Sequence, residues 1–308
     1  MSTEGGTRAI IAALLANLGI AVTKFIAYLI SGSTSMLAES VHSLADSGNQ
    51  VLLIIGGRRS TRAATPEHPF GFGRERYVSA FLVSIILFSV GGVFSIYEGV
   101  HKIEHPEPIE VPWLPIAVLL ISIGLESFSL RTALRESAEQ RRGISILQFV
   151  RRAKAPELPV VVLEDIAALL GLTLALVGVS AAVLTGNGVW DGVGTIGIGL
   201  LLVAVAVLLG IETQSLLVGE GASPADTEAI RAAATAGADV QRIIHMKTLY
   251  LGPEELLVAM KVAVTPTQSA AAEAAAINAL EARVRAAVPA ARVMYIEPDI
   301  DDPTRPAG

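Results

Sequence analysis

Six apolar stretches, each long enough to cross a lipid bilayer, dominate the first two thirds of this 308-residue chain. A helix needs about 20 mainly apolar residues to span the hydrocarbon core, and within that layer only helices and closed barrels satisfy every backbone hydrogen bond. The chain is 52% hydrophobic and only 17% charged, against about a quarter charged in ordinary soluble domains. We therefore predict an α-helical membrane protein with six transmembrane helices over residues 8–30, 35–57, 77–100, 112–134, 158–184 and 189–211.

The links between these stretches are short and polar, and their basic residues gather on one side. The links after the first, third and fifth stretches are nearly free of lysine and arginine, whereas those after the second and fourth are rich in both. The basic residues are Arg58, Arg59, Arg62, Arg74, Arg76, Arg131, Arg135, Arg141, Arg142, Arg151, Arg152 and Lys154. Because basic loops stay on the cytoplasmic side, we predict that both termini are cytoplasmic. A composition rich in Ala, Arg and Val, without a recognisable signal or transit peptide, favours a bacterial cytoplasmic membrane.

Beyond residue 211 the composition becomes that of a small α+β domain. Ser223 is the expected N-cap of a first helix, and two strands are predicted over residues 240–252 and 255–264. An alanine-rich helix over 269–288 and a strand over 291–298 follow. The order α-β-β-α-β suits a sheet with both helices on one face.

These patterns divide the chain into three parts. We predict a six-helix transmembrane domain over residues 1–215 and a cytoplasmic α+β domain over 216–300. The C-terminal segment that contains Asp301 and Asp302, residues 301–308, is predicted to be a disordered tail.

The second apolar stretch opens with an unusually polar segment, SMLAESVHSLADSGNQ, over residues 35–50. On a helix, His42 and Asp46 form an i,i+4 pair on a single face, and Glu39 and Gln50 lie about one turn before and after it. Imidazole and carboxylate are ligands that divalent metals take, and placing them in the hydrocarbon layer is costly unless they serve a purpose. The alternative interpretation is a polar helix face that neighbouring helices satisfy.

Other apolar stretches also carry ionisable groups. Glu164 and Asp165 are adjacent in the fifth stretch, and two acids in an apolar run imply a cation, a proton or a distant base. We expect Asp165 to face the second stretch. The alternative interpretation is that Asp165 is an acid at the cytoplasmic membrane interface. We expect the aliphatic stem of Lys24 to lie along the apolar surface, so that its ammonium group reaches the membrane interface. Glu126 is expected to pair with an arginine such as Arg131.

The residue content excludes several classes of function. There is no cysteine, so disulfides, iron–sulfur clusters and thiolate metal sites are ruled out. Any metal is then held by nitrogen and oxygen. A net charge of −6 gives no support to nucleic-acid binding. No HExxH motif and no serine or cysteine nucleophile stands out within a span, so we predict neither enzymatic activity nor a resident cofactor.

Several segments together resemble the cation diffusion facilitator family. The motifs that carry the resemblance are HSLADSGNQ in the second stretch, HPFGFGRERY in the basic link that follows, YEGVHKI, SLRTAL, ELPVVVLED and LLVGEGASP. They look like the branch of mitochondrial zinc transporters and their bacterial relatives, and they cover nearly the whole chain. The resemblance implies a homodimeric divalent-cation/proton antiporter with one tetrahedral metal site per protomer, between the second and fifth helices.

The resemblance also implies which residues bind the metal. The second-helix ligands of the family fall on His42 and Asp46, and the fifth-helix aspartate falls on Asp165. The histidine that the family usually has one turn earlier is Val161 here, which leaves one ligand unassigned. We assign Glu164 to it, and the alternatives are Glu39, Asn49, Gln50 and water.

Metal sites that some relatives have elsewhere are incomplete in this sequence. In the basic link His68 is present, but Phe72 and Thr65 stand where the second histidine and the preceding acid are expected. We therefore interpret His68 as structural. The C-terminal domain contains a single histidine, His245, which does not favour a binuclear site there.

The resulting functional hypothesis is a secondary transporter that exports a divalent metal from the cytoplasm in exchange for protons. Zinc is the first choice of substrate. Manganese or iron becomes credible when nitrogen ligands are lost. The alternatives are a non-transporting, membrane-anchored metal sensor or interaction protein, and a proton-coupled carrier for an organic solute. The expected partners are the metal ion, protons, the lipid bilayer and a second copy of the chain.

Overall fold

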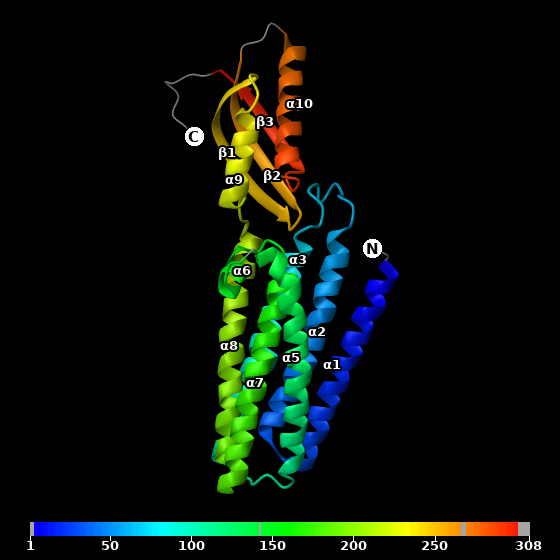
Figure 1. The fold of residues 1–308 in the computed structure, drawn as a ribbon, viewed down its shortest axis with the longest axis vertical. Coiled ribbons are helices and arrows are strands. Elements are labelled where there is room, and N and C mark those ends of the chain that lie inside the picture. The colour runs from blue at the N-terminus through cyan, green and yellow to red at the C-terminus, as the bar shows by residue number, and fades with distance from the viewer. Residues whose placement is uncertain (1–2, 142, 266–268, 301–308) are drawn as a thin grey trace. The chain divides into compact units, whose positions relative to one another are not determined.

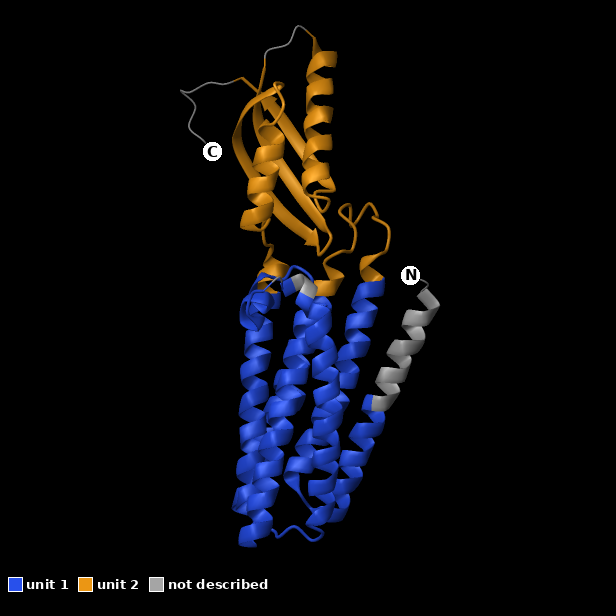
Figure 2. Cartoon of the chain, viewed as in Figure 1, with its two compact units in different colours: residues 1–58, 78–213 blue, residues 59–77, 214–308 orange. Residues whose placement is uncertain are grey.

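The chain forms two compact units, residues 1–58 with 78–213 and residues 59–77 with 214–308 (Figure 2). The computed structural model describes residues 3–141, 143–265 and 269–300, apart from the side chains of residues 3–16, 139 and 140. The predicted disordered tail, residues 301–308, lies outside the described residues.

The first unit is built from long helices that run alongside one another (Figure 1). Their positions agree with the six predicted stretches, although most extend several residues further. They are α1 (Thr3–Ser31), α2 (Thr34–Ser60), α3 (Glu75–Ile86), η1 (Leu87–Val93), α4 (Phe94–Glu104), α5 (Trp113–Arg141), α7 (Glu157–Thr185) and α8 (Val189–Val218). The elements α3, η1 and α4 form one continuous helix with a π-helical segment in its middle, which the sequence pattern did not reveal.

Among the described residues, four helices are long and apolar enough to cross a membrane: Glu75–Glu104, Trp113–Ala138, Glu157–Thr185 and Val189–Val218. In α1, the described apolar segment is shorter, Asn17–Ser31. Helix α2 is 27 residues long but is not among the four, because serines and charged side chains lower its hydropathy. The polar segment that makes α2 interesting for function therefore also weakens its signal as a membrane span.

A short helix, α6 (Ile146–Arg152), lies between α5 and α7 and was not predicted. It begins with a capping box, because the side chain of Ser145 accepts from the backbone of Gln148 and Gln148 bonds back to the backbone of Ser145.

Glycines allow α8 to approach its neighbours closely. A Cβ atom added to Gly99 of α4 would lie 2.8 Å from the carbonyl oxygen of Gly192, and one added to Gly178 of α7 would lie 3.0 Å from the Cα of Gly194. Small residues at such crossings are the usual means of packing helices in membranes.

One end of this unit collects three short links, and we call it the short-link end. The turn between α1 and α2 lies there, with residues 105–112 and 186–188. Asp191, at the start of α8, is fully buried and accepts hydrogen bonds from the backbone of Thr34 at 2.7 Å and the hydroxyl of Ser33 at 3.0 Å. This carboxylate caps α2 and fixes its first turn against α8. The opposite end, where α2 and α5 finish in arginines, is the arginine-rich end.

The second unit contains the predicted α-β-β-α-β order. It consists of α9 (Pro224–Thr235), β1 (Val240–Gly252), β2 (Glu255–Val264), α10 (Ala270–Ala287) and β3 (Val293–Asp299). The sheet order is β1-β2-β3, with β1 antiparallel and β3 parallel to β2. Both strands before α10 have the predicted bounds, and Ser223 caps α9 as expected by accepting from the backbone of Asp226 at 3.1 Å.

The core of this unit follows from the alternation along β2. Its residues Leu256, Val258, Met260 and Val262 are buried. They pack in one cluster with side chains of both helices, including Ile230 of α9 and Leu280 and Val284 of α10. The two helices therefore cover the same face of the sheet, as predicted.

Candidate metal centre

Helix α2 holds its imidazole and carboxylate side by side. Nδ1 of His42 lies 3.5 Å from Oδ1 of Asp46, and the two side chains are 1% and 17% exposed. Neither ring nitrogen of His42 has a hydrogen-bond partner among the described residues, and Oδ1 of Asp46 also lacks one. Buried polar atoms are normally satisfied, because leaving one unpaired costs about 1–3 kcal/mol. The pair is therefore available to a ligand.

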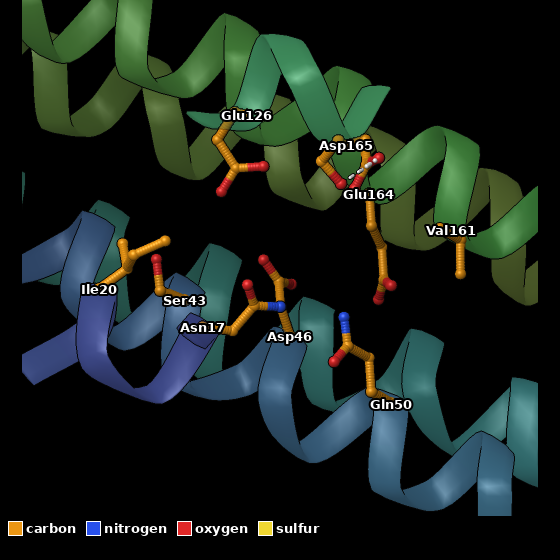
Figure 3. Close-up of a pocket in the computed structure, with 10 residues that line it drawn as sticks. Asn17, Ile20, Ser43, Asp46, Gln50, Glu126, Val161, Glu164 and Asp165 are labelled. Atoms are coloured by element: carbon orange, nitrogen blue, oxygen red, sulfur yellow. Dashed lines mark hydrogen bonds between the residues drawn. The ribbon is translucent and has the colours of Figure 1, made fainter. Parts of the chain in front are cut away.

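A small cavity lies beside this pair, within the helical unit (Figure 3). Its volume is about 30 Å³, enough for one or two water-sized groups. Helices α1 and α2 form one wall, and α5 and α7 form the other (Figure 3). The lining residues are Asn17, Ile20, Ser43, Asp46, Gln50, Glu126, Ser129, Val161, Glu164 and Asp165.

Both acids of α7 reach this cavity, each with a different partner. Asp165 accepts a hydrogen bond from the hydroxyl of Ser129 on α5 at 3.0 Å. Glu164, which is 5% exposed, accepts one from the side-chain amide of Asn49 on α2 at 2.6 Å. Adjacent helical residues point about 100° apart, so the two carboxylates approach the cavity from different sides.

The structure thus brings three of the four predicted ligands, Asp46, Glu164 and Asp165, to one cavity. His42 does not line the cavity, but its ring lies next to Asp46, which does. Within the described part of the chain, no three His, Cys, Asp or Glu side chains are close enough together to hold a metal ion in this conformation.

Two expectations about charged residues are wrong. Lys24 does not extend to the interface, because it is 1% exposed and its Nζ lies 3.0 Å from Oε2 of Glu39. It also donates to the hydroxyl of Ser43 at 2.9 Å. Glu39, an alternative for the fourth ligand, is therefore engaged by an ammonium group within the bundle.

Glu126 is the second correction. No ion pair with Arg131 is present among the described residues, and the carboxylate of Glu126 instead points into the cavity (Figure 3). The sequence signal for a functional role of Glu126 was a lone acid in an apolar stretch. The sequence did not reveal which way it faced.

Side chains of the basic link pack against one another. The rings of His68 and Phe72 lie 4.6 Å apart, and the guanidinium of Arg62 lies 4.8 Å from the centre of the Phe72 ring. This packing is consistent with a structural role for His68.

The helical unit matches a known family. A family model described as the cation efflux transmembrane domain matches residues 10–218. The proton-coupled zinc antiporter SLC30A9, mitochondrial, of Xenopus laevis is 32% identical over 254 residues, which cover 82% of this chain and 45% of that protein. Metal tolerance protein C4 of Arabidopsis thaliana is 30% identical over 257 residues, which cover 82% of this chain and 56% of that protein. The probable cation efflux system protein Rv2025c of Mycobacterium tuberculosis is 34% identical over 128 residues, 41% of this chain and 38% of that protein.

The chain spans about half the length of the first two of these relatives. The residues matched by the family model include the whole cavity and the His42–Asp46 pair. The cavity therefore lies within the part of the chain that defines the family, and the chain is an integral membrane protein.

Proposed function

Because the chain belongs to the cation efflux family, we propose that it is a secondary transporter that exports a divalent metal cation in exchange for protons. The observation that carries the proposal is the cavity where Asp46 of α2 meets Glu164 and Asp165 of α7, beside a buried imidazole with no hydrogen-bond partner among the described residues. Members of this family are transporters rather than enzymes, so the metal is substrate and not cofactor.

The spacing of His42 and Asp46 supports a shared metal ion. Two ligands at about 2.0–2.1 Å from a tetrahedral metal lie roughly 3.3 Å apart, and the observed separation is 3.5 Å. Glu164 and Asp165 would complete the site after an approach of α7 toward α2. During that approach, the hydrogen bond between Asn49 and Glu164 would either break or be kept while both side chains move together.

Zinc is the proposed substrate. The relative from Xenopus laevis is named a zinc antiporter, and imidazole with carboxylates suits Zn²⁺. Manganese or iron remains the alternative, because carboxylate oxygens outnumber nitrogen here and harder ions accept such a set.

Proton exchange follows from the chemistry of the ligands. Imidazole and carboxylates bind metal only when deprotonated. Protons that reach the site from the far side of the membrane would compete with the metal and release it, and a protonated site would then return to receive the next ion.

The proposed arrangement in the membrane has six spans, with α1 and α2 included, and places the arginine-rich end in the cytoplasm. Both termini are then cytoplasmic, and the bacterial cytoplasmic membrane is the proposed location. The proposed division is a transmembrane domain over 1–215, a cytoplasmic domain over 216–300 and a tail over 301–308. A homodimer is proposed as the working form.

Zinc uptake into inverted membrane vesicles tests this function. We expect uptake to fall to background in His42→Ala and in Asp46→Ala. Ser40→Ala is the matched control, because Ser40 is on the same helix and its hydroxyl bonds only to the carbonyl of Leu37 among the described residues. Uptake preserved in both ligand variants would refute the site.

A further inference from the structure

Lys24 and Glu39 form a buried ion pair that the proposed chemistry at the metal does not use. Nζ and Oε2 are 3.0 Å apart, and the side chains are 1% and 0% exposed. Removing two charges from water costs so much that apolar residues of similar volume often stabilise a protein equally well or better. Stability alone is therefore a poor reason for this pair.

The pair lies between the cavity and the short-link end. On α1, Lys24 is one turn beyond Ile20, which lines the cavity, and α1 runs toward the short-link end. On α2, Glu39 precedes His42 by three residues, about 4.5 Å along the axis in that same direction. Ser43, another lining residue, accepts from Lys24 at 2.9 Å. The ammonium group therefore borders the cavity.

The carboxylate of Glu39 also fills the space in front of α7. A Cβ atom added to Gly171 would lie 2.8 Å from Oε1 of Glu39. Three helices thus meet at this pair: α1 supplies the ammonium, α2 the carboxylate, and α7 the glycine that makes room for it. Oε1 has no hydrogen-bond partner among the described residues.

We propose that Lys24 and Glu39 form a charge lock that closes the cavity toward the short-link end, and that the lock parts when the ion leaves in that direction. The proposal rests on the transport function proposed above. The fixed ammonium group repels a dication that moves outward along this path. Once Lys24 moves away, the carboxylate of Glu39 offers oxygen atoms to the leaving ion.

The absence of native cysteine allows a direct test with single introduced thiols. Ile20→Cys places a thiol in the cavity wall. Glu107→Cys, in an exposed link, identifies the short-link side of the membrane. The purified full chain in liposomes is treated with a positively charged, membrane-impermeant thiosulfonate from each side in turn. The rate of modification is then compared with and without Lys24→Met, which keeps side-chain length but removes the charge.

We expect Lys24→Met to raise the rate at Ile20→Cys at least tenfold from the short-link side, with less than a twofold change from the other side. The double variant Lys24→Met/Glu39→Gln, in which no charge is left unpaired, should behave in the same way. Thr23→Val is the control, because Thr23 is the exposed neighbour of Lys24 and, among the described residues, its hydroxyl donates only to the carbonyl of Gly19 in α1. It should leave both rates unchanged.

Two results would overturn the charge lock. Either the rate from the short-link side stays within twofold of the parent in both variants, or the rates rise equally from both sides because the bundle has loosened. The test needs no metal, so it is separate from the transport claim. If the parent protein shows no zinc flux but the thiol at position 20 responds as expected, the transport proposal is refuted and the charge lock is supported.

Discussion

Asn49 donates a 2.6 Å hydrogen bond to Glu164, and this contact joins α2 to α7 beside the cavity. Both side chains are buried, with Asn49 fully inaccessible. The amide thereby fixes the carboxylate that we assign as the fourth ligand. A positioning partner of this kind commonly changes metal affinity by about 10–100-fold when removed.

Asn49→Ala is therefore expected to weaken zinc transport through the apparent affinity. The KM for zinc should rise by about tenfold, because Glu164 loses the group that orients it. Zinc dependence of flux in proteoliposomes measures this. The matched control is Asn278→Ala, since Asn278 is exposed on α10. An unchanged KM in Asn49→Ala would show that Glu164 does not contribute to binding.

Val161→His is expected to change metal selectivity. Val161 lines the cavity one turn before Asp165, so an imidazole there adds a nitrogen ligand on the same face. Because imidazole favours zinc over manganese, the ratio of zinc to manganese flux should rise by about tenfold, a difference near 1.4 kcal/mol. Competition between the two ions measures the ratio. Val161→Leu, which adds volume without a ligand, should leave it unchanged, and an equal ratio in all three proteins contradicts the assigned position.

Gly171→Ala is expected to destabilise the helical unit. Its added methyl group would lie 2.8 Å from Oε1 of Glu39. Because the ion pair with Lys24 holds this carboxylate in place, the overpacking should cost about 1–3 kcal/mol. Gly197→Ala is the control, because its methyl group would make an ordinary contact at 3.5 Å with Leu174. Thermal unfolding in detergent compares the two, and equal midpoints would mean that Glu39 does not occupy this space.

The C-terminal unit should lose stability in strongly alkaline solution. Burial, with a smaller contribution from Asp226, raises the pKa of Tyr250 to about 12. An unfolded tyrosine titrates near pH 10, so the unfolded chain loses its proton first and stability falls between about pH 10 and pH 12, by roughly 3 kcal/mol. Unfolding measured against pH should show a smaller decline in Tyr250→Phe. Tyr295→Phe, at a position that is 60% exposed, should behave like the parent, and identical profiles for all three would contradict the assignment.

The elements that local pattern determines could be predicted from the sequence. The strands β1 and β2 have the predicted bounds because alternation and a turn at Gly252 and Pro253 define them locally. The His42–Asp46 pair also required only helical periodicity. The bounds of the long helices were predicted less well, because helices continue beyond the apolar layer into the polar links.

Contacts between helices could not be predicted in the same way. Lys24 and Glu39 are on different helices, and their pairing depends on how α1 and α2 rotate about their axes. The direction of Glu126 depends likewise on the rotation of α5, which has almost no difference in polarity between its faces. The sequence around Lys24 is compatible with an ammonium group at the interface. In the structure Lys24 is instead buried because the carboxylate of Glu39 lies close to it.

The most direct test of the central claim records zinc and proton movement together in proteoliposomes containing the full chain. The account predicts that an imposed zinc gradient drives protons in the opposite direction, and that both fluxes disappear in Asp46→Asn. Zinc movement without proton movement, or coupled exchange that survives in Asp46→Asn, would contradict it.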